Sequence, residues 1–576
     1  MRKNILLAAL LLPFGFLSCE KASFLDRKPY STTSPENFYT RESQFKLALT
    51  GCYEVINTKK LDLSGNNYSY GTYSQGLQWI MGCPSDEIVT AKTGTVPYYM
   101  GQANFLESDA GLKQFWTAFY HGIYRCNELL DNIGRLETEE QKVQYAAEAR
   151  FLRAFYYYHL AWVYGAVPVV DYPSLGKEPR MPLERVYACI LDDLQYAYDN
   201  LSEKGVLTTS SANRYTAAAY IARICNYLAA CKRNDVGRAF LGEQPLNDFS
   251  WVDADAMNRR ALEACKDVIE NSPYILIDNY SNLFRETTKA DQYKECLFLS
   301  DIAINPGSGD WPASSRLAAP SGSSYTPEVY GGACMAVPKI FLMYDKEDPR
   351  RDHNFTSAMS VNSGKTMTYE TIDGYDYPIP FYRSTSSAYK EWYNSDTQTY
   401  NPYYSGPCAG KYRLVKKGAM AHSNSQHCIS YPLMRLADVY LMAAEAEYFV
   451  SGDAAEARKY LRPVVLRAAQ GDEDLCDRLM TTYGRTDFVE EILESREREL
   501  CFEMSRKYDL IRFGRIDDAL LNLPLGTDIL PGREFTANAK NGITAVRENW
   551  EPHKIWAPIS AEQLGVNSNL TQNARW

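Results

Sequence analysis

The chain has 576 residues, of which 45% are hydrophobic and 23% charged, so it can bury a large core in one domain or in two to three smaller ones. The 71 acidic residues outnumber the 61 basic ones, which gives a net charge of −10, and no segment is rich in Lys and Arg. Because phosphate recognition needs such basic segments, nucleic acid is excluded as an expected partner.

The first twenty residues have the composition of a secretory signal. Arg2 and Lys3 precede an apolar run from Ile5 to Leu17, which is shorter than the roughly 20 residues that a membrane-spanning helix needs. The run ends at Cys19, and a Cys preceded by a small residue suits lipoprotein processing. We therefore predict that residues 1–18 are removed and that Cys19 carries the acyl chains that anchor the protein. The alternative is a soluble secreted protein with an ordinary Cys at this position.

Several long segments carry apolar residues at steps of three and four, which predicts amphipathic helices and a mainly α fold. Gly134 and Gly165 are placed to end the first two helices. Small residues let the helices pack in pairs, as in tetratricopeptide hairpins, so four degenerate hairpins are predicted, with a non-repetitive bundle as the alternative. The predicted helices are 113–133, 142–164, 183–201, 215–231, 254–270, 433–449, 454–469 and 488–503.

Three stretches outside the helical blocks are dense in Gly, Ser, Pro, Thr and Tyr. They are residues 62–103, 304–335 and 354–428. Loops of this length in a compact protein are usually functional or disordered, and the many aromatic residues argue against disorder. We predict that these stretches bind the ligand, with short strands in or beside them, for example 297–304 and 429–433.

Aromatic residues make up 13% of the chain, and 44 residues are Tyr. An aromatic ring can stack on the apolar C–H face of a sugar while its polar tip stays hydrated. The candidates for ligand binding in the three stretches are Tyr98, Tyr99, Trp311, Tyr325, Trp392 and Tyr393. The alternative for each is that it packs its loop onto the scaffold. In contrast, Trp79, Trp116 and Trp162 lie in periodic apolar patterns and are predicted to be core residues.

One pair of carboxylates invites a catalytic interpretation. Glu499 and Glu503 lie one helical turn apart, with Cβ atoms about 5 to 6 Å from each other, near the carboxylate separation of retaining glycosidases. The arginines close by in sequence favour ionised carboxylates in salt bridges, whereas a general acid needs a raised pKa. These arginines are Arg496, Arg498, Arg506, Arg512 and Arg515. We therefore expect no catalytic residue.

Metal and disulfide frameworks are not indicated by the spacing of the other polar residues. Residues 345–352 lack the spaced acidic ligands of a calcium loop and are predicted to form a salt-bridged turn. No Cys-x-x-Cys spacing occurs, so no metal and no cofactor are expected. Among 14 cysteines, Cys225 and Cys231 are near enough in sequence to suggest a disulfide, yet on one helix they point in different directions. Buried free thiols are predicted at Cys126, Cys189, Cys225, Cys265 and Cys501.

Short motifs along the whole chain, taken in order, resemble the SusD/RagB family of outer-membrane nutrient-binding lipoproteins from Bacteroidota. After Cys19 they are Phe24–Asp26, Asn127–Leu130, Glu148–Ala154, Tyr164–Pro168, Arg435–Asp438, Glu445–Ala446, Arg496–Leu500, Phe502–Glu503, Arg506–Gly514, Trp556–Ile559 and Gln572–Asn573. The ending Ala574–Trp576 departs from the Gly-aromatic finish that is usual in the family.

The resemblance implies one SusD-like domain over residues 19–576, with a tetratricopeptide scaffold mainly at 40–60, 113–272 and 433–515. It also implies a lipoprotein of polysaccharide utilisation that forms a lid over a SusC-like TonB-dependent transporter at the outer membrane. The expected ligand is a glycan. Peptide binding of the RagB kind is the first alternative, a helical glycosidase the second, and a scaffold for other proteins the third.

Overall fold

The structure is a computed structural model, and it describes most of the chain outside the N-terminal segment and parts of the three stretches. The described residues are 38–57, 77–90, 96–174, 176–203, 210–285, 288–301, 335–356, 368–372, 375–379, 393–394, 399–400, 403–404, 408–409, 411–412, 430–524, 534–535 and 537–576. Cys19 and the predicted signal therefore lie outside the described residues. No helix in these ranges is long and apolar enough to cross a membrane.

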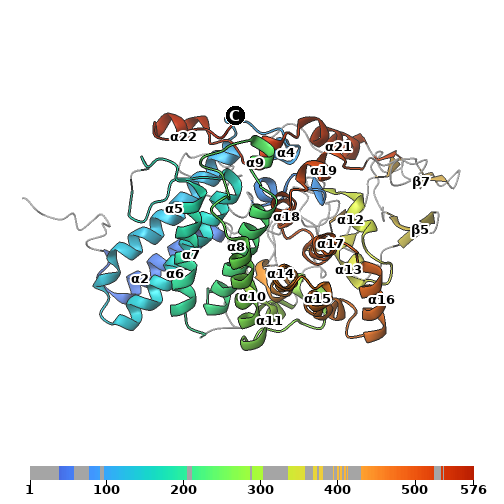
Figure 1. Cartoon of the computed structure of the whole chain (residues 1–576), viewed down its shortest axis with the longest axis horizontal. Coiled ribbons are helices and arrows are strands. Elements are labelled where there is room, and N and C mark those ends of the chain that lie inside the picture. The colour runs from blue at the N-terminus through green and yellow to red at the C-terminus, as the bar shows by residue number, and fades with distance from the viewer. Residues whose placement is uncertain are drawn as a thin grey trace, which may run out of the picture.

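Helices dominate the described chain, as the sequence predicts. Long helices follow one another along the longest axis of the molecule, from α2 and α5 at one end to α15 and α16 at the other (Figure 1). The longer helices are α2 (Glu42–Asn57), α5 (Ala110–Asn132), α6 (Glu139–Tyr164), α7 (Leu183–Asn200), α8 (Arg214–Arg233), α10 (Ala254–Asn271), α14 (Leu436–Ser451), α15 (Ala454–Ala468), α16 (Glu473–Tyr483), α17 (Phe488–Leu500) and α21 (Ala537–Asn549).

Shorter helices fill the space between and beside these. They are α4 (Val96–Gly101), α9 (Arg238–Leu241), α11 (Lys289–Glu295), α12 (Pro338–Leu342), α13 (Pro349–Asn354), α18 (Arg506–Arg512), α19 (Ile516–Leu521) and α22 (Ala561–Val566). A π-helical turn, η2, spans Leu77–Gly82, and 3-10 turns occur at Ile133–Arg135, Tyr280–Phe284 and Pro552–Ile555.

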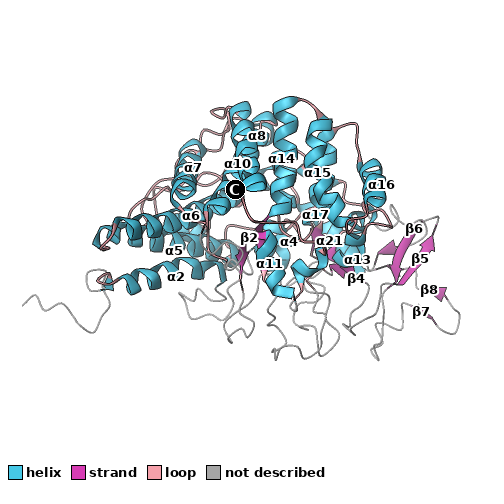
Figure 2. Ribbon diagram, turned by 90° about the horizontal axis from the view of Figure 1, so that it is seen from below, coloured by secondary structure: helices cyan, strands magenta, loops and turns pink. Residues whose placement is uncertain are grey.

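Each long helix packs against the next one. Contacts run from α5 to α6, α7, α8, α10, α14, α15 and α16 in that order. Figure 2 shows these helices as one row. The mainly α fold class is thereby confirmed, while the tetratricopeptide character of the pairs stays a prediction. The helix α16 was not predicted.

Local sequence signals explain how the paired helices begin and end. Thr138 and Gln141 form a capping box at the start of α6, and Gly165 ends that helix with φ 72°, a backbone angle that favours glycine. Gly122 lies where α5 meets α6. A Cβ placed at this position would come within 2.6 Å of the Tyr156 ring, so a larger residue would not fit without movement. This close approach confirms that small residues allow tight helix contacts.

The core consists of the apolar faces of these helices. Trp116 is 6% exposed and Trp162 is 8% exposed, so both are core residues as predicted, whereas the Trp79 side chain is not among those described. The cysteines whose side chains the structure describes have free thiols. Cys225 and Cys231, the nearest pair, are both buried and unpaired by a disulfide. They fill helix interfaces as small apolar side chains.

The described strands form two-stranded pairs. One buried pair is β2 (Cys296–Ser300) with β11 (Tyr431–Arg435), which run antiparallel. The others are β1 (Ile88–Val89) with β3 (Met335–Ala336), β4 (Phe355–Thr356) with β10 (Cys408–Ala409), β5 (Thr368–Ile372) with β6 (Tyr375–Ile379), β7 (Tyr393–Asn394) with β8 (Thr399–Tyr400), and β9 (Tyr403–Tyr404) with β12 (Glu534–Phe535), the last in parallel.

Several predicted boundaries are wrong, among them the strand predicted at 297–304, which spans Cys296–Ser300. The strand predicted at 429–433 extends to Arg435, so the helix predicted from residue 433 begins at Leu436 instead, since Arg435 itself is extended. The helix predicted to reach Glu503 ends at Leu500, because Phe502 and Met504 both adopt φ 63°, in the left-handed region. Tertiary contacts described below explain this irregular turn.

Candidate functional site

The structure places few of the predicted binding aromatics. Tyr98 and Tyr99 lie in the short helix α4, where Tyr99 is half-buried and the Tyr98 side chain is not described. Tyr393 begins strand β7, and its side chain is not described either. Trp311, Tyr325 and Trp392 lie outside the described residues. Their role in binding therefore stays a prediction.

Strand pairing brings the three predicted stretches together. In β1, Ile88 pairs with Ala336 of β3, so the first stretch adjoins the end of the second. In β10, Cys408 pairs with Thr356 of β4, which closes the third stretch upon its own start. Strand β10 also contacts β3. Segments that are more than 300 residues apart in sequence thus converge on one region of the protein.

One short segment, residues 496–512, binds the first and the third of these stretches, and we call it the anchoring segment. It includes the end of α17, the irregular turn and α18. Asp86, at the base of the first stretch, accepts hydrogen bonds from Arg506 Nε and Nη2, both at 2.8 Å. Its neighbour Glu87 accepts a hydrogen bond from the backbone N–H of Phe502. The first stretch is therefore fixed by buried charges.

The third stretch is attached to the same segment. The buried ammonium of Lys411 donates to the backbone carbonyls of Glu499 and Cys501, at 3.1 and 2.9 Å, and to Glu503 Oε1 at 2.6 Å. Because the helix stops at Leu500, these carbonyls are free to accept from outside it. The left-handed Phe502 and Met504 thus turn the backbone toward two of the predicted stretches.

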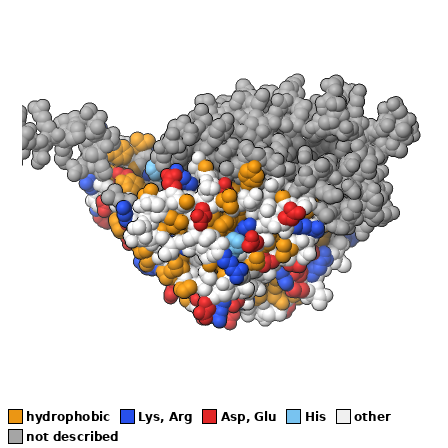
Figure 3. Space-filling model, turned by 90° about the horizontal axis from the view of Figure 1, so that it is seen from above, with side chains coloured by type: hydrophobic (Ala, Val, Ile, Leu, Met, Phe, Trp, Pro, Cys, Tyr) orange, Lys and Arg blue, Asp and Glu red, His pale blue; other side chains and the backbone are white. Residues whose placement is uncertain are grey.

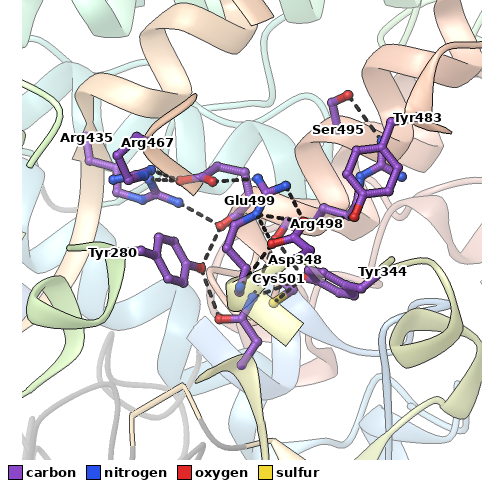
Figure 4. Close-up of polar contacts among 12 residues, drawn as sticks. Tyr280, Tyr344, Asp348, Arg435, Arg467, Tyr483, Ser495, Arg498, Glu499 and Cys501 are labelled. Carbon is purple, nitrogen blue, oxygen red and sulfur yellow. Dashed lines mark hydrogen bonds and ion pairs between the residues drawn. The ribbon is translucent and has the colours of Figure 1, made fainter. Parts of the chain in front are cut away.

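Glu499 lies at the centre of a buried ionic cluster (Figure 4). Its carboxylate accepts hydrogen bonds from Arg350 Nη1 at 2.9 Å, from Arg435 Nη1 at 2.6 Å and from Arg467 Nη2. Burial alone would raise the pKa of this carboxyl, but the three guanidinium groups outweigh burial and hold it well below its usual range. Glu499 is therefore ionised at neutral pH and is fully used in salt bridges.

The expectation of salt-bridged carboxylates is confirmed for Glu499, but its expected partners are wrong. None of the arginines near it in sequence is its ligand within the described chain. They bind other carboxylates: Arg496 pairs with Asp438 and Asp509, Arg498 with Glu494, Arg506 with Asp86 and Glu497, Arg512 with Glu445 and Asp509, and Arg515 with Glu490.

Glu497 is the carboxyl in this region that most resembles a general acid. Burial and the neighbouring Asp86 raise its pKa to about 7, although Arg506 acts in the opposite direction. However, Glu497 is only 2% exposed and is held by Arg506 Nη2 at 2.8 Å. A substrate cannot reach it, so the raised pKa reflects burial within the scaffold.

The acidic turn at residues 345–352 is salt-bridged, as predicted. Asp348 caps α13 by accepting from the backbone N–H of Arg350 at 3.0 Å, and its carboxylate also binds the Arg350 guanidinium at 2.7 Å. Tyr483 adds a further hydrogen bond at 2.8 Å. The turn therefore links α13, at the start of the third stretch, to the ionic cluster around Glu499.

Two family profiles match the N-terminal and the C-terminal parts of the chain. The profile described as the SusD family matches residues 337–576, and a second profile, described as starch-binding and associating with the outer membrane, matches residues 23–228. The chain belongs to the SusD family. A SusD-like protein of Formosa agariphila is 25% identical, with 99% of this chain and 98% of the relative aligned.

Solved structures of other proteins show the same fold. A SusD homologue from Bacteroides thetaiotaomicron superposes with a TM-score of 0.71 at 20% identity, covering 94% of this chain and 98% of that one. Surface glycan-binding protein A from the same organism, in complex with laminarihexaose, gives a TM-score of 0.64 at 18% identity, covering 92% and 99%. At such identities the likeness establishes the fold alone.

Proposed function

We propose that this SusD-family protein is a cell-surface lipoprotein that captures a glycan and passes it to a SusC-like TonB-dependent transporter of the outer membrane. The observation that carries the proposal is the match to a starch-binding, outer-membrane family over residues 23–228, together with the SusD match over 337–576. Catalysis is not part of the proposal, because Glu499 is occupied by Arg350, Arg435 and Arg467.

The geometry of the loop bases supports this function. Two of the three aromatic-rich stretches are attached to the anchoring segment, and short strand pairs bring segments of all three together. Rings on neighbouring loops can therefore act on one oligosaccharide. The proposed stacking residues are Trp311, Tyr325, Trp392, Tyr393, Tyr98 and Tyr99. Fixed loop bases reduce the entropy lost when the ligand binds.

The test is calorimetry on the full-length protein in detergent against panels of neutral oligosaccharides and of peptides. Binding of a saccharide, weakened about tenfold by Trp311→Ala or Trp392→Ala, supports the proposal, since one stacked aromatic ring contributes on the order of 1 kcal/mol. Lys459→Met, a change at an exposed scaffold residue, is the matched control. A response to peptides alone would replace the glycan by a peptide ligand of the RagB kind.

The lipid anchor is a separate part of the proposal. An acyl chain adds about 0.8 kcal/mol of membrane affinity for each buried methylene, so several chains would keep the protein beside its transporter at a high effective concentration. Replacing Cys19→Ala should move the protein from the membrane fraction to the soluble one and abolish labelling by radioactive palmitate. Unchanged labelling of the variant would refute lipidation at Cys19.

A further inference from the structure

A groove of about 360 Å³ lies on the side of α5 that faces α22, away in sequence from all three loop stretches. We call it the α5 groove. Its principal lining residues are Trp116, Tyr120, Tyr124, Tyr172, Glu178 and Gln563. The volume falls in the range of small-molecule sites. Figure 1 shows α22 above α5, and Figure 3 shows this upper face, where charged side chains of both signs are scattered among apolar and neutral ones.

The aromatic lining comes from a regular pattern on α5. Trp116, Tyr120 and Tyr124 are spaced by four residues, so their rings follow one face of the helix. Trp116 and Tyr120 pack with ring centroids 4.9 Å apart and form the floor. Tyr124 is 41% exposed, and Tyr172, from the segment after α6, is 53% exposed. Exposed aromatic rings beside an aromatic floor are available to a ligand.

Hydrogen bonds hold two of the tyrosine tips. Tyr120 donates to the carbonyl of Pro168 at 2.7 Å, and Tyr172 donates to Glu178 Oε1 at 2.8 Å. The rings are therefore fixed as plates, while their faces stay apolar. A ring that is fixed before binding loses little entropy on contact with a ligand, so the groove is preorganised for binding.

The segment that includes Val170, Tyr172 and Glu178 forms one wall of the α5 groove, and hydrogen bonds from neighbouring elements hold it in place. Asn127 Nδ2 donates to the carbonyls of Val170 and Tyr172, at 3.0 and 3.2 Å, and Asn127 is in turn bound by Arg153 at 2.8 Å. The far end of the wall is held by Asn567, which donates to the carbonyl of Glu178 at 2.9 Å. Two family motifs, around residues 127 and 153, thus position the groove.

The polar lining suits a ligand with hydroxyl groups and no negative charge. Among the described lining residues Glu178 is the only one ionised at neutral pH. Partial burial acts to raise the pKa of Glu178, but hydrogen bonds from Ser174 and Tyr172 outweigh it and lower the pKa. Burial lowers the pKa of His121 below its usual value, so this imidazole is neutral. The amide of Gln563 lies 3.4 Å from Thr117 Oγ1 at the α22 side.

We infer that the α5 groove is a second carbohydrate site, which takes a neutral sugar ring stacked on Tyr124 and Tyr172 with its hydroxyl groups toward Glu178 and Gln563. The choice of a sugar rests on the proposed function, whereas the site itself rests on the groove. A uronic acid is disfavoured, because its carboxylate would face Glu178. A second weak site would retain a long polysaccharide while its other part occupies the loops.

The test measures binding by the full-length protein in detergent, using laminarihexaose, maltohexaose and trigalacturonic acid in calorimetry. A loop variant carrying Trp311→Ala, Tyr325→Ala and Trp392→Ala should keep weak binding of a neutral hexasaccharide and bind no trigalacturonic acid. Adding Tyr124→Ala and Tyr172→Ala should weaken the remaining binding by about tenfold or more. Tyr172→Phe, which keeps the ring but not its hydrogen bond, is the matched control and should retain binding within about threefold.

Each other outcome decides against one of the two proposals. Loss of all binding in the loop variant overturns the groove site and leaves the loop proposal standing. Unchanged binding in the loop variant that Tyr124→Ala and Tyr172→Ala abolish supports the groove and refutes the loop residues. Choline also stacks on aromatic rings. If choline binds the groove and no neutral saccharide does, the occupant is a cation and the carbohydrate assignment is wrong.

Discussion

The anchoring segment and the α5 groove use polar chemistry in opposite ways. In the anchoring segment, carboxylates and guanidinium groups lie almost fully buried and bind one another, as around Glu499. In the α5 groove, charges are few and aromatic rings are exposed, as at Tyr172. The comparison shows that a dense cluster of acidic and basic side chains can be wholly architectural, while the surface suited to a ligand carries little charge.

The largest expected effect comes from breaking the ionic cluster. Arg435 binds Glu295, Glu499 and Glu503 while only 1% exposed, so Arg435→Met leaves buried carboxylates short of a partner. We expect the free energy of unfolding to fall by roughly 3 to 5 kcal/mol, measured by urea denaturation. Lys459→Met, in an exposed pair with Glu456, should leave stability unchanged. Equal effects of the two variants would mean that the cluster contributes no more than a surface pair.

The next largest effect is expected from low pH, which should weaken the buried salt bridges. Burial would raise the pKa of Asp438, but Arg496 and Arg223 hold it well below the usual range, as the arginines do for Glu499. Because these folded-state pKa values lie below the unfolded ones, the stabilisation is complete above about pH 4.3 and is lost as pH falls further. Urea denaturation between pH 7 and pH 3 should show a loss of several kcal/mol.

The matched variant for this titration is Glu499→Gln, which cannot take up a proton at this position. Its unfolding free energy should depend less steeply on pH below about 4.3 than that of the wild type. Parallel slopes for the two proteins would show that folding does not lower the pKa of Glu499.

A smaller effect should distinguish the buried face of α5 from the 3-10 turn Ile133–Arg135 that follows it. A Cβ at Gly122 would meet the Tyr156 ring at 2.6 Å, so Gly122→Ala should destabilise the protein by about 1 to 3 kcal/mol through overpacking. Nothing lies within 4 Å of the corresponding position at Gly134. Gly134→Ala is therefore the control, expected to be neutral in thermal denaturation. A neutral Gly122→Ala would indicate that α5 and α6 can separate easily.

The smallest effect on stability is expected in the groove itself. Tyr124 is 41% exposed, so Tyr124→Ala should change the free energy of unfolding by less than about 0.5 kcal/mol. The same variant is expected to weaken saccharide binding in the loop variant background. A large loss of stability would show that the ring is part of the scaffold, and the contrast between the two regions would disappear.

The helices could be predicted from sequence because their signals are local. Apolar periodicity predicts α6 and α8, and Gly165 marks a helix end through a backbone angle that other residues rarely adopt. The early end of α17 could not be predicted, since it depends on Lys411 and Glu87 binding the turn from distant parts of the chain.

The ionic cluster was only half predictable for the same reason. The ionisation of Glu499 follows from the abundance of arginine, but its ligands Arg350 and Arg435 lie 149 and 64 residues away in sequence. In contrast, the α5 groove has a local signal in the sequence. Trp116, Tyr120 and Tyr124 form an aromatic stripe with a spacing of four residues, and the exposed end of that stripe distinguishes it from a core pattern.

The bond between Asp86 and Arg506 joins residues 420 positions apart, and it has a consequence for the order of folding. As the chain emerges, the N-terminal helices can pack with their neighbours, whereas Asp86 lacks its bidentate partner Arg506 until the chain has passed that residue, although Lys339 is available earlier. Long-range contacts of this kind form late and slowly. A polypeptide interrupted before that point would retain much of its row of helices, but the first stretch would lack its attachment to Arg506.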